Sequence, residues 1–265
     1  ITLLHGVTGS GKTELYIHLI QSHLDLGKQV LLLIPEIALT TQLINRLEKY
    51  FGKQIGVYHS KFNQNERVEI WQKVHANHPE EFRVIIGARS SVFLPFQDLG
   101  LVIVDEEHES SYKQHDPSPR YHGRDASIYL AKMFNAKVLL GSATPSLESF
   151  QNTIDHKYGY VRLASRFGDL NMPEILIANT QQETLSKSMT SHFSSLLIDH
   201  MTMALENKEQ VILFQNRRGY TPYWSCEICG WIPKCHACDV SLTYHKHINL
   251  LKCHYCGYTI EPMGS

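Results

Sequence analysis

The chain has 265 residues, and its composition of 43% hydrophobic and 19% charged residues is ordinary for a soluble globular protein. A formal net charge of −1 provides no overall attraction to nucleic acid, so any DNA contact must be local. No apolar run approaches the ~20 residues that span a bilayer, and no signal peptide opens the chain. We therefore expect a cytoplasmic protein without membrane contact. Because the chain starts at Ile1, in an apolar run and without a methionine, we also expect it to be a fragment.

Short apolar runs alternate with amphipathic stretches through residues 1–165. This alternation predicts an α/β fold with a parallel sheet flanked by helices, because continuous apolar runs suit strands covered on both faces. The predicted strands are Ile1–Leu4, Val30–Ile34, Val84–Ile86, Leu101–Val104 and Val138–Leu140.

Local signals also predict helices between these strands. Gly27 stands where a C-cap would end a first helix, and Asn63 with Glu66 fits a capping box at the start of another. A helix between them has an apolar residue at every fourth position: Leu39, Leu43, Leu47 and Phe51.

The first functional motif fits the pattern G-x-x-x-x-G-K-[ST] between a predicted strand and a predicted helix. Its residues are Gly6, Val7, Thr8, Gly9, Ser10, Gly11, Lys12 and Thr13. Backbone N–H groups of such a loop surround a phosphate, with the positive end of the helix dipole behind them. Lys12 would reach the β- and γ-phosphates of ATP, and the Thr13 hydroxyl would bind magnesium. The motif predicts a nucleotide site.

Acidic residues follow the predicted strand Leu101–Val104, in the order Asp105-Glu106-Glu107-His108. A P-loop enzyme places its second magnesium contact at such a strand end. Asp105 would hold the ion through its water shell, and Glu106 would act as the general base on the attacking water. This pairing favours hydrolysis of the nucleotide over phosphoryl transfer to another substrate.

The alternating pattern lapses around Ser165–Asn179, and a new unit follows. We expect a helix near Phe193–Leu205 and a strand at Val211–Phe214, followed by a cysteine-rich region. The predicted domains are residues 1–165, residues 166–225 as the start of a second lobe, and residues 226–265 as a truncated zinc-binding region.

All six cysteines form three Cys-x-x-Cys pairs: Cys226/Cys229, Cys235/Cys238 and Cys253/Cys256. Paired cysteines without a secretory signal favour metal over disulfides, and tetrahedral zinc needs two pairs. Three pairs leave one pair over, and spacing alone does not say which. The first two pairs are near enough in sequence to close one site.

Several segments resemble a known family. Ser142-Ala143-Thr144 resembles the third motif of superfamily-two helicases, and Ser142 and Thr144 would couple γ-phosphate loss to movement. Four further segments resemble the bacterial primosomal helicases, which restart replication at abandoned forks. These segments are Ile34–Thr40, Gly87–Phe93, Asp105–Gln114 and Phe214–Tyr220. Together with the cysteine pairs, they extend the resemblance over the whole chain.

The resemblance implies a RecA-like P-loop lobe and an ATP-dependent DNA helicase that uses magnesium and zinc. It implies that Tyr112, Lys113 and Gln114 belong to an aromatic-rich loop that couples DNA to ATP hydrolysis. His108 would share in this coupling, and Arg89 would contact the DNA backbone. The implied partners are forked DNA with single-stranded segments, primosome proteins and single-stranded-DNA-binding protein.

The family also implies a zinc pairing in which Cys235, Cys238, Cys253 and Cys256 share one ion. Cys226 and Cys229 would then pair with cysteines beyond this chain, and His236 and His254 would not be ligands. Because the family's arginine finger is absent, we expect poor hydrolysis by the isolated chain; a turnover of about 1 per second or more would contradict this. The alternatives are a translocase that does not unwind DNA, and a zinc-bearing interaction module with a nucleotide-sensing P-loop.

Overall fold

The structure is a computed structural model that describes residues 1–35, 41–59, 63–168, 173–214, 231–238 and 240–262. The chain divides into two compact units, Ile1–Glu174 and Ile175–Ser265. None of the described helices has both the length and the apolar character that a membrane span requires.

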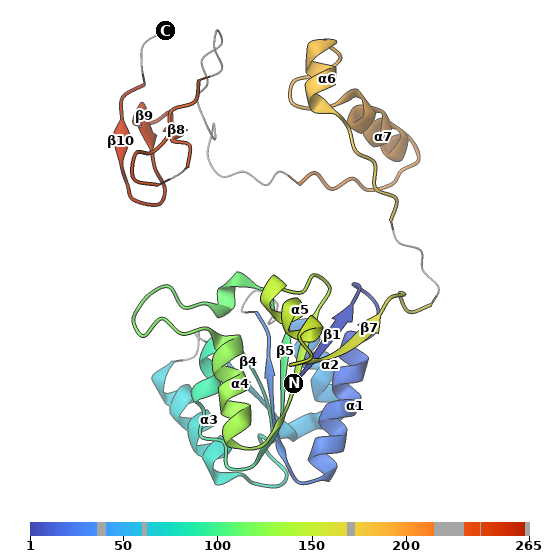
Figure 1. Ribbon diagram of the computed structural model, residues 1–265. Helices are drawn as coiled ribbons and strands as arrows, with labels where there is room; N and C mark the ends of the chain where they lie inside the picture. The colour runs from blue at the N-terminus through green and yellow to red at the C-terminus, as the bar shows by residue number, and fades with distance from the viewer. Residues whose placement is uncertain (36–40, 60–62, 169–172, 215–230, 239, 263–265) are drawn as a thin grey trace. The chain divides into compact units, whose positions relative to one another are not determined.

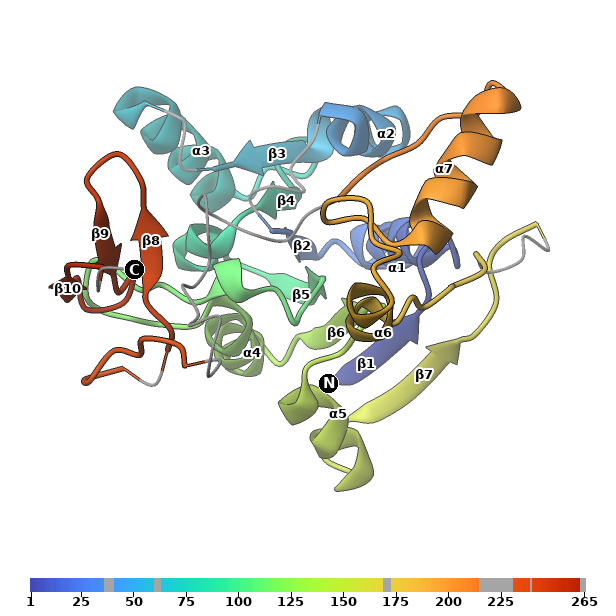
Figure 2. The ribbon, with the colours of Figure 1, turned by 90° about the horizontal axis from the view of Figure 1, so that it is seen from above.

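The first unit is built on a sheet whose neighbouring strands are all parallel. Its order among the described residues is β3-β4-β2-β5-β6-β1-β7, which Figure 2 shows from above. The strands are β1 (Thr2–Gly6), β2 (Gln29–Leu33), β3 (Ile55–Tyr58), β4 (Val84–Gly87), β5 (Leu99–Asp105), β6 (Lys137–Ser142) and β7 (Gly159–Leu163).

Helices cover both faces of this sheet (Figure 1). They are α1 (Lys12–Asp25), α2 (Thr41–Phe51), α3 (Gln64–Ala76), α4 (Gly123–Met133) and α5 (Leu147–Ile154). The strands alternate between two cores. Along β5, for example, Leu101 and Ile103 pack with α1, whereas Val102 and Val104 pack with α3 and α4. Burial on both faces explains why these strands are continuous apolar runs.

The helix signals are confirmed where the structure describes them. Gly27 follows the end of α1 with a φ of 70°, a left-handed conformation that favours glycine. Asn63 caps α3, and its amide oxygen and the Glu66 side chain each accept a backbone N–H, which completes the capping box. In α2, Leu47 and Phe51 are buried and Leu43 is partly buried, whereas Leu39 lies outside the described residues.

The five strands predicted in residues 1–165 are present, with two further strands, β3 and β7, at the edges of the sheet. Edge strands carry a weaker signal because they are less buried, and β7 is exposed along most of its length. The strand predicted at Val211–Phe214 is wrong. Those residues have no strand structure and Phe214 is exposed, because no strand in the described part of the chain pairs with them.

In the second unit, α6 (Thr180–Leu185) and α7 (Ser195–Glu206) follow each other closely. The helix expected near Phe193–Leu205 is α7, which starts at the cap Ser194. The backbone N–H of Ser195 donates to Glu183 Oε2 over 2.6 Å and links the two helices.

The cysteine-rich part of the second unit holds a small antiparallel sheet with the order β10-β9-β8 in its described residues. Its strands are β8 (Thr243–His245), β9 (Leu250–Lys252) and β10 (Thr259–Ile260). Residues 231–262, as far as the structure describes them, form what we call the ribbon.

Candidate functional site

The phosphate-loop motif connects the end of β1 to the start of α1. Gly9 and Gly11 have φ values of 78° and 89°, which a residue with a side chain rarely adopts. Gly11 caps α1 without any side-chain hydrogen bond, which leaves the first N–H groups of the helix open to a ligand. The Lys12 ammonium donates to the carbonyl oxygen of Gly6 over 2.8 Å. The loop thus has the geometry that phosphate binding requires.

Three strand ends meet next to this loop, because β5, β6 and β1 are parallel neighbours. Asp105 pairs in register with Gly141, and Ser142 pairs with His5. The acidic motif and the Ser-Ala-Thr motif therefore lie at the same edge of the sheet as the phosphate loop. The carboxyl ends of parallel strands are where ligands bind in folds of this class.

Asp105 is held by a tyrosine that the sequence analysis did not single out. The Tyr16 hydroxyl donates to Asp105 Oδ1 over 2.8 Å, and a Cβ at Gly141 would overlap that hydroxyl. Burial raises the pKa of Asp105, although the Tyr16 hydrogen bond and the charge of Lys12 oppose this shift. A buried carboxylate with a raised pKa gains from a cation placed beside it, so Asp105 suits a magnesium contact.

Glu106 has a φ of 47° and lies in the left-handed region just beyond β5. Burial and then the negative charge of Asp105 raise the pKa of Glu106. A raised pKa makes the Glu106 carboxylate more basic, and a carboxylate of this kind beside the phosphate-loop motif suits a general base.

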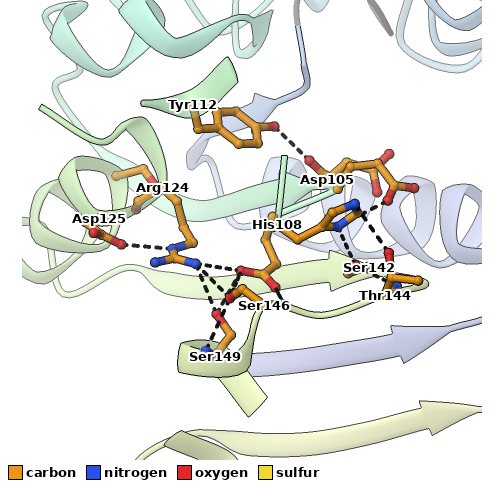
Figure 3. Close-up of polar contacts among 12 residues, drawn as sticks. Asp105, His108, Tyr112, Arg124, Asp125, Ser142, Thr144, Ser146 and Ser149 are labelled. Carbon is orange, nitrogen blue, oxygen red and sulfur yellow. Dashed lines mark hydrogen bonds and ion pairs between the residues drawn. The ribbon is translucent and has the colours of Figure 1, made fainter. Parts of the chain in front are cut away.

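His108 contacts Ser142 and Thr144 of the Ser-Ala-Thr motif (Figure 3), and it also approaches Glu106. Its Nδ1 lies 2.8 Å from Ser142 Oγ and 3.7 Å from Glu106 Oε2. Its Nε2 lies 3.3 Å from Thr144 Oγ1. The Thr144 N–H in turn donates to Ser142 Oγ over 3.0 Å. One imidazole thus contacts both motifs.

Glu107 is fully buried and forms a network that the sequence analysis missed. Figure 3 labels its partners Arg124, Ser146 and Ser149. Arg124 of α4 donates to Glu107 Oε2 over 2.9 Å. Ser146 donates its N–H to Oε1 over 2.7 Å, and Ser149 donates its hydroxyl to Oε2 over 2.7 Å. Burial alone would raise the pKa of Glu107, but these hydrogen bonds outweigh it and lower the pKa. The network ties the acidic motif to α4 and to the start of α5.

The predicted coupling residues lie in a segment that Arg89 anchors. Arg89 Nη1 donates to the carbonyl oxygen of Lys113 over 2.9 Å and to that of Ser111 over 3.3 Å. Lys113 Nζ donates to the Arg120 carbonyl oxygen. Gln114 Nε2 donates to the carbonyl oxygens of two prolines further along the segment. These contacts hold residues 110–122 in a defined shape.

Tyr112 differs from its expected role. Only 1% of it is exposed, and its hydroxyl donates to the Asp105 carbonyl oxygen over 2.7 Å (Figure 3). A buried ring offers no face to a nucleic-acid base. In this structure Tyr112 instead joins the predicted coupling segment to the strand end that carries Asp105.

A cleft of about 500 Å³ opens between three segments of the first unit. Arg89 and Ser90 follow β4, Pro35 follows β2, and the third wall is the coupling segment with Lys113 and His115. The cleft therefore presents basic and hydroxyl groups, together with the Asp116 carboxylate, beside the segment that Tyr112 joins to the acidic motif.

The four cysteines of the ribbon form the second candidate site. The sulfur atoms of Cys235, Cys238, Cys253 and Cys256 all lie within 4.8 Å of one another. Tetrahedral zinc with ~2.3 Å bonds separates its sulfur ligands by about 3.8 Å, so the donor set fits zinc. His236 packs against Tyr258, and His254 Nε2 lies 3.2 Å from His245 Nε2. Cys226 and Cys229 lie outside the described residues.

Two backbone turns hold these cysteines in place. The N–H of Cys235 donates to the Val240 carbonyl oxygen over 2.9 Å, and the N–H of Cys253 donates to the Tyr258 carbonyl oxygen over 2.8 Å. A backbone hydrogen bond from Cys256 lowers the pKa of the Cys253 thiol to about 7. The hydrogen bond with Cys256 instead raises the pKa of the Cys238 thiol to about 12, so it is the distances between the sulfur atoms that indicate a metal site.

Residues 2–153 match the family model for DEAD/DEAH box helicases. Residues 235–260 match the model for the PriA DNA helicase Cys-rich region domain. The chain is 43% identical to the replication restart protein PriA of Bacillus subtilis, over 99% of this chain and 32% of that protein. It is 45% identical to PriA of Rickettsia typhi, over 100% of this chain and 40% of that protein.

The chain thus spans about a third of the length of the curated relatives that it matches. Among solved structures, RecG bound to a three-way DNA junction is 24% identical with a TM-score of 0.44, over 62% of this chain and 21% of that one.

Proposed function

The chain belongs to the DEAD/DEAH box helicase family, and we propose that it is part of an ATP-dependent DNA helicase that restarts replication at stalled or abandoned forks and helps to assemble the primosome. The observation that carries this proposal is the meeting of the phosphate loop, the acidic motif and the Ser-Ala-Thr motif at the ends of β1, β5 and β6. The similarity to PriA proteins over almost the whole chain supports the cellular role.

In this proposal the phosphate loop, residues 6–13, binds the phosphates of ATP. Lys12 leaves the Gly6 carbonyl oxygen and neutralises charge on the β- and γ-phosphates. Thr13 and Asp105 hold magnesium, which would neutralise the charge that develops as the phosphate bond breaks. Glu106 accepts a proton from the attacking water, a role that its raised pKa supports.

His108, Ser142 and Thr144 would carry the coupling. Loss of the γ-phosphate changes the charge beside Glu106, and His108 contacts both Glu106 and Ser142. Because the Tyr112 hydroxyl donates to the Asp105 carbonyl oxygen, a shift in the position of Asp105 would also move the coupling segment. Bistable hydrogen-bond partners of this kind can convert a small change into a larger movement.

The DNA contact would lie in the cleft next to Arg89 and Lys113. Basic and hydroxyl side chains there suit a nucleic-acid backbone, and a chain of net charge −1 needs such a local site. Lys113 and Gln114 would act as coupling residues, and the buried Tyr112 would act through its hydrogen bond to Asp105.

We also propose a division of the chain into two helicase lobes and a zinc region, and a set of partners. Residues 1–165 would form the first helicase lobe, residues 166–225 the start of the second, and residues 226–265 the zinc region. The partners would be forked DNA with single-stranded segments, primosome proteins and single-stranded-DNA-binding protein.

The test measures ATP hydrolysis by the full-length protein with and without forked DNA. We expect hydrolysis that DNA stimulates and that Lys12→Ala abolishes, since the ammonium would no longer stabilise the transferred phosphoryl group. An exposed cation in the turn between α5 and β7 provides the control, because Lys157→Ala should leave hydrolysis unchanged. Hydrolysis at the wild-type rate in Lys12→Ala would overturn the proposal.

The same assay separates the alternatives. A translocase would hydrolyse ATP with DNA but would not separate the strands of a labelled fork. A nucleotide-sensing interaction module would bind ATP without any DNA-stimulated hydrolysis. The DEAD/DEAH family match favours the helicase.

A further inference from the structure

Two buried hydrogen-bond donors beside the phosphate loop have no partner among the described residues. They are Ser10 Oγ and Arg166 Nε. A buried donor without a partner carries the full cost of its lost hydration, so such groups indicate a missing ligand or ion. Ser10 belongs to the phosphate-loop motif itself. Arg166 lies more than 150 residues further along the chain and belongs to no recognised motif.

The backbone around Arg166 runs alongside the phosphate loop. Strand β7 is paired with β1 at the edge of the sheet, with Leu163 opposite Gly6. Beyond this pairing, Val7 N–H donates to the Leu163 carbonyl oxygen over 3.2 Å. Phe167 N–H then donates to the Gly9 carbonyl oxygen over 2.9 Å. These two bonds fix residues 163–167 against the loop.

The side chain of Arg166 packs against the middle of the loop. A Cβ added to Gly9 would lie 3.8 Å from Arg166 Cγ and 3.9 Å from its Cδ. The stem of Arg166 therefore lies against the backbone of Gly9, and the buried Nε is bonded directly to the Cδ of that stem. The N–H groups of this loop are the ones that would surround the phosphates.

We propose that Arg166 is a phosphate-contacting residue of the nucleotide site, an inference that rests on the proposed function. A guanidinium has donors only and matches phosphate oxygens in a bidentate geometry. A phosphate group would give Arg166 Nε and Ser10 Oγ the acceptor that the described residues do not provide. Arg166 is distant from Lys12 in the sequence but lies beside the same loop, so its positive charge adds to that of Lys12.

The experiment measures the affinity of the full-length protein for fluorescent ADP. We expect Arg166→Ala to weaken binding about 10- to 100-fold, the loss typical of a hydrogen bond to a charged group. The affinity of Arg166→Lys should lie between those of the wild type and Arg166→Ala, because lysine keeps the charge but loses the bidentate geometry. Arg162→Ala is the matched control, since Arg162 is an exposed arginine on β7, and it should bind like the wild type.

Competition with inorganic pyrophosphate and with adenosine identifies the contacted group. We expect Arg166→Ala to weaken pyrophosphate by a similar factor and to leave adenosine unchanged. Weakened ADP binding with unchanged pyrophosphate binding would overturn the proposal, because the contact would then be to the nucleoside. Should Arg166→Ala not fold, Arg166→Gln keeps part of the stem along Gly9 and gives the same test.

Lys12→Ala distinguishes failure of this proposal from failure of the proposed function. If Lys12→Ala weakens ADP binding and Arg166→Ala does not, the role of Arg166 is wrong and the nucleotide site stands. If neither variant weakens binding, the nucleotide site itself is wrong.

Discussion

The sheet of the first unit and the ribbon of the second are held together by different means. Every residue of β2 is buried, and two extended apolar cores cover the two faces of the sheet. The buried core of the ribbon, in its described residues, consists of Leu242 and Leu251 with Cys235 and Cys253. Half of that core is therefore metal-ligand sulfur. The sheet that carries the phosphate loop is therefore held by hydrophobic burial, whereas we expect the ribbon to depend on a bound ion.

Magnitudes support this contrast. Two fully buried leucines contribute about 3–6 kcal/mol. A structural zinc site contributes an apparent ~10–16 kcal/mol at neutral pH. The ion is thus the largest single stabilising contribution available to the ribbon.

Removal of zinc should have the largest effect on stability of the changes considered, and it should affect the ribbon but not the first unit. We expect a chelator, or Cys253→Ser, to unfold the ribbon and to leave the first unit folded, because no described residue of that unit belongs to the cysteine cluster. Metal content and amide exchange resolved by segment measure both results.

Cys226→Ser is the matched control for Cys253→Ser. It should keep the zinc of the ribbon if Cys235, Cys238, Cys253 and Cys256 hold the ion. Zinc release by Cys226→Ser would contradict the assignment of the ion to the four ribbon cysteines. A ribbon that keeps its protection from amide exchange without metal would contradict its dependence on the ion.

An intermediate effect is expected from the buried network of the first unit. Glu107→Ala should lower the free energy of unfolding by about 3 kcal/mol, because it removes the buried carboxylate from Arg124 and leaves only the exposed Asp125 as an ion-pair partner. Urea unfolding followed by circular dichroism measures this change. Glu107→Gln should cost less, since an amide oxygen can still accept from Ser146. Zinc content should stay constant, and an unchanged midpoint for Glu107→Ala would show that the network does not stabilise the sheet.

The smallest effect is a gain. Asp105→Asn should raise the free energy of unfolding by about 1 kcal/mol, or the melting temperature by ~2–4 °C, because burial raises the pKa of Asp105 and disfavours its charge. Asparagine can still accept the Tyr16 hydrogen bond. Thermal unfolding at neutral pH measures the gain, and a lower melting temperature would contradict it.

The pH dependence of the two carboxylates has opposite signs. Asp105 has a raised folded-state pKa, so its penalty is present above that pKa and disappears as the pH falls toward its usual value near 3.8. The gain of Asp105→Asn should shrink accordingly in acid. Glu107 has a lowered pKa, so its contribution is complete above about 4.5 and is lost as the pH falls through the folded-state pKa.

The accuracy of the sequence predictions followed the strength of the local signal. Central strands such as Val30–Ile34 are apolar at every position, and they form strands in the structure. The predicted strand at Val211–Phe214 has the same apolar character, but a strand also needs a hydrogen-bonded neighbour, and none of the described strands provides one. Composition can indicate that a segment is able to form a strand, but it does not identify its partner.

The candidate site shows the same division. The phosphate loop and the acidic motif were recognisable because their chemistry needs particular residues at fixed spacing. Tyr16, Arg124 and Arg166 carry no such spacing, since each acts on a residue far away in the sequence. The glycine at position 141 is the sequence feature that reflects the position of Tyr16, because a side chain there would overlap the tyrosine hydroxyl.

The sequence by itself determined the α/β architecture, the phosphate loop, the acidic motif and the presence of paired cysteines. Each of these is encoded by neighbouring residues, whose periodicity or spacing is the physical requirement itself. The tertiary structure alone decided that Tyr112 is buried, that Glu107 pairs with Arg124, and that Arg166 lies along Gly9. Those contacts depend on which strands become neighbours, and strand order is set by packing over the whole unit rather than by any one segment.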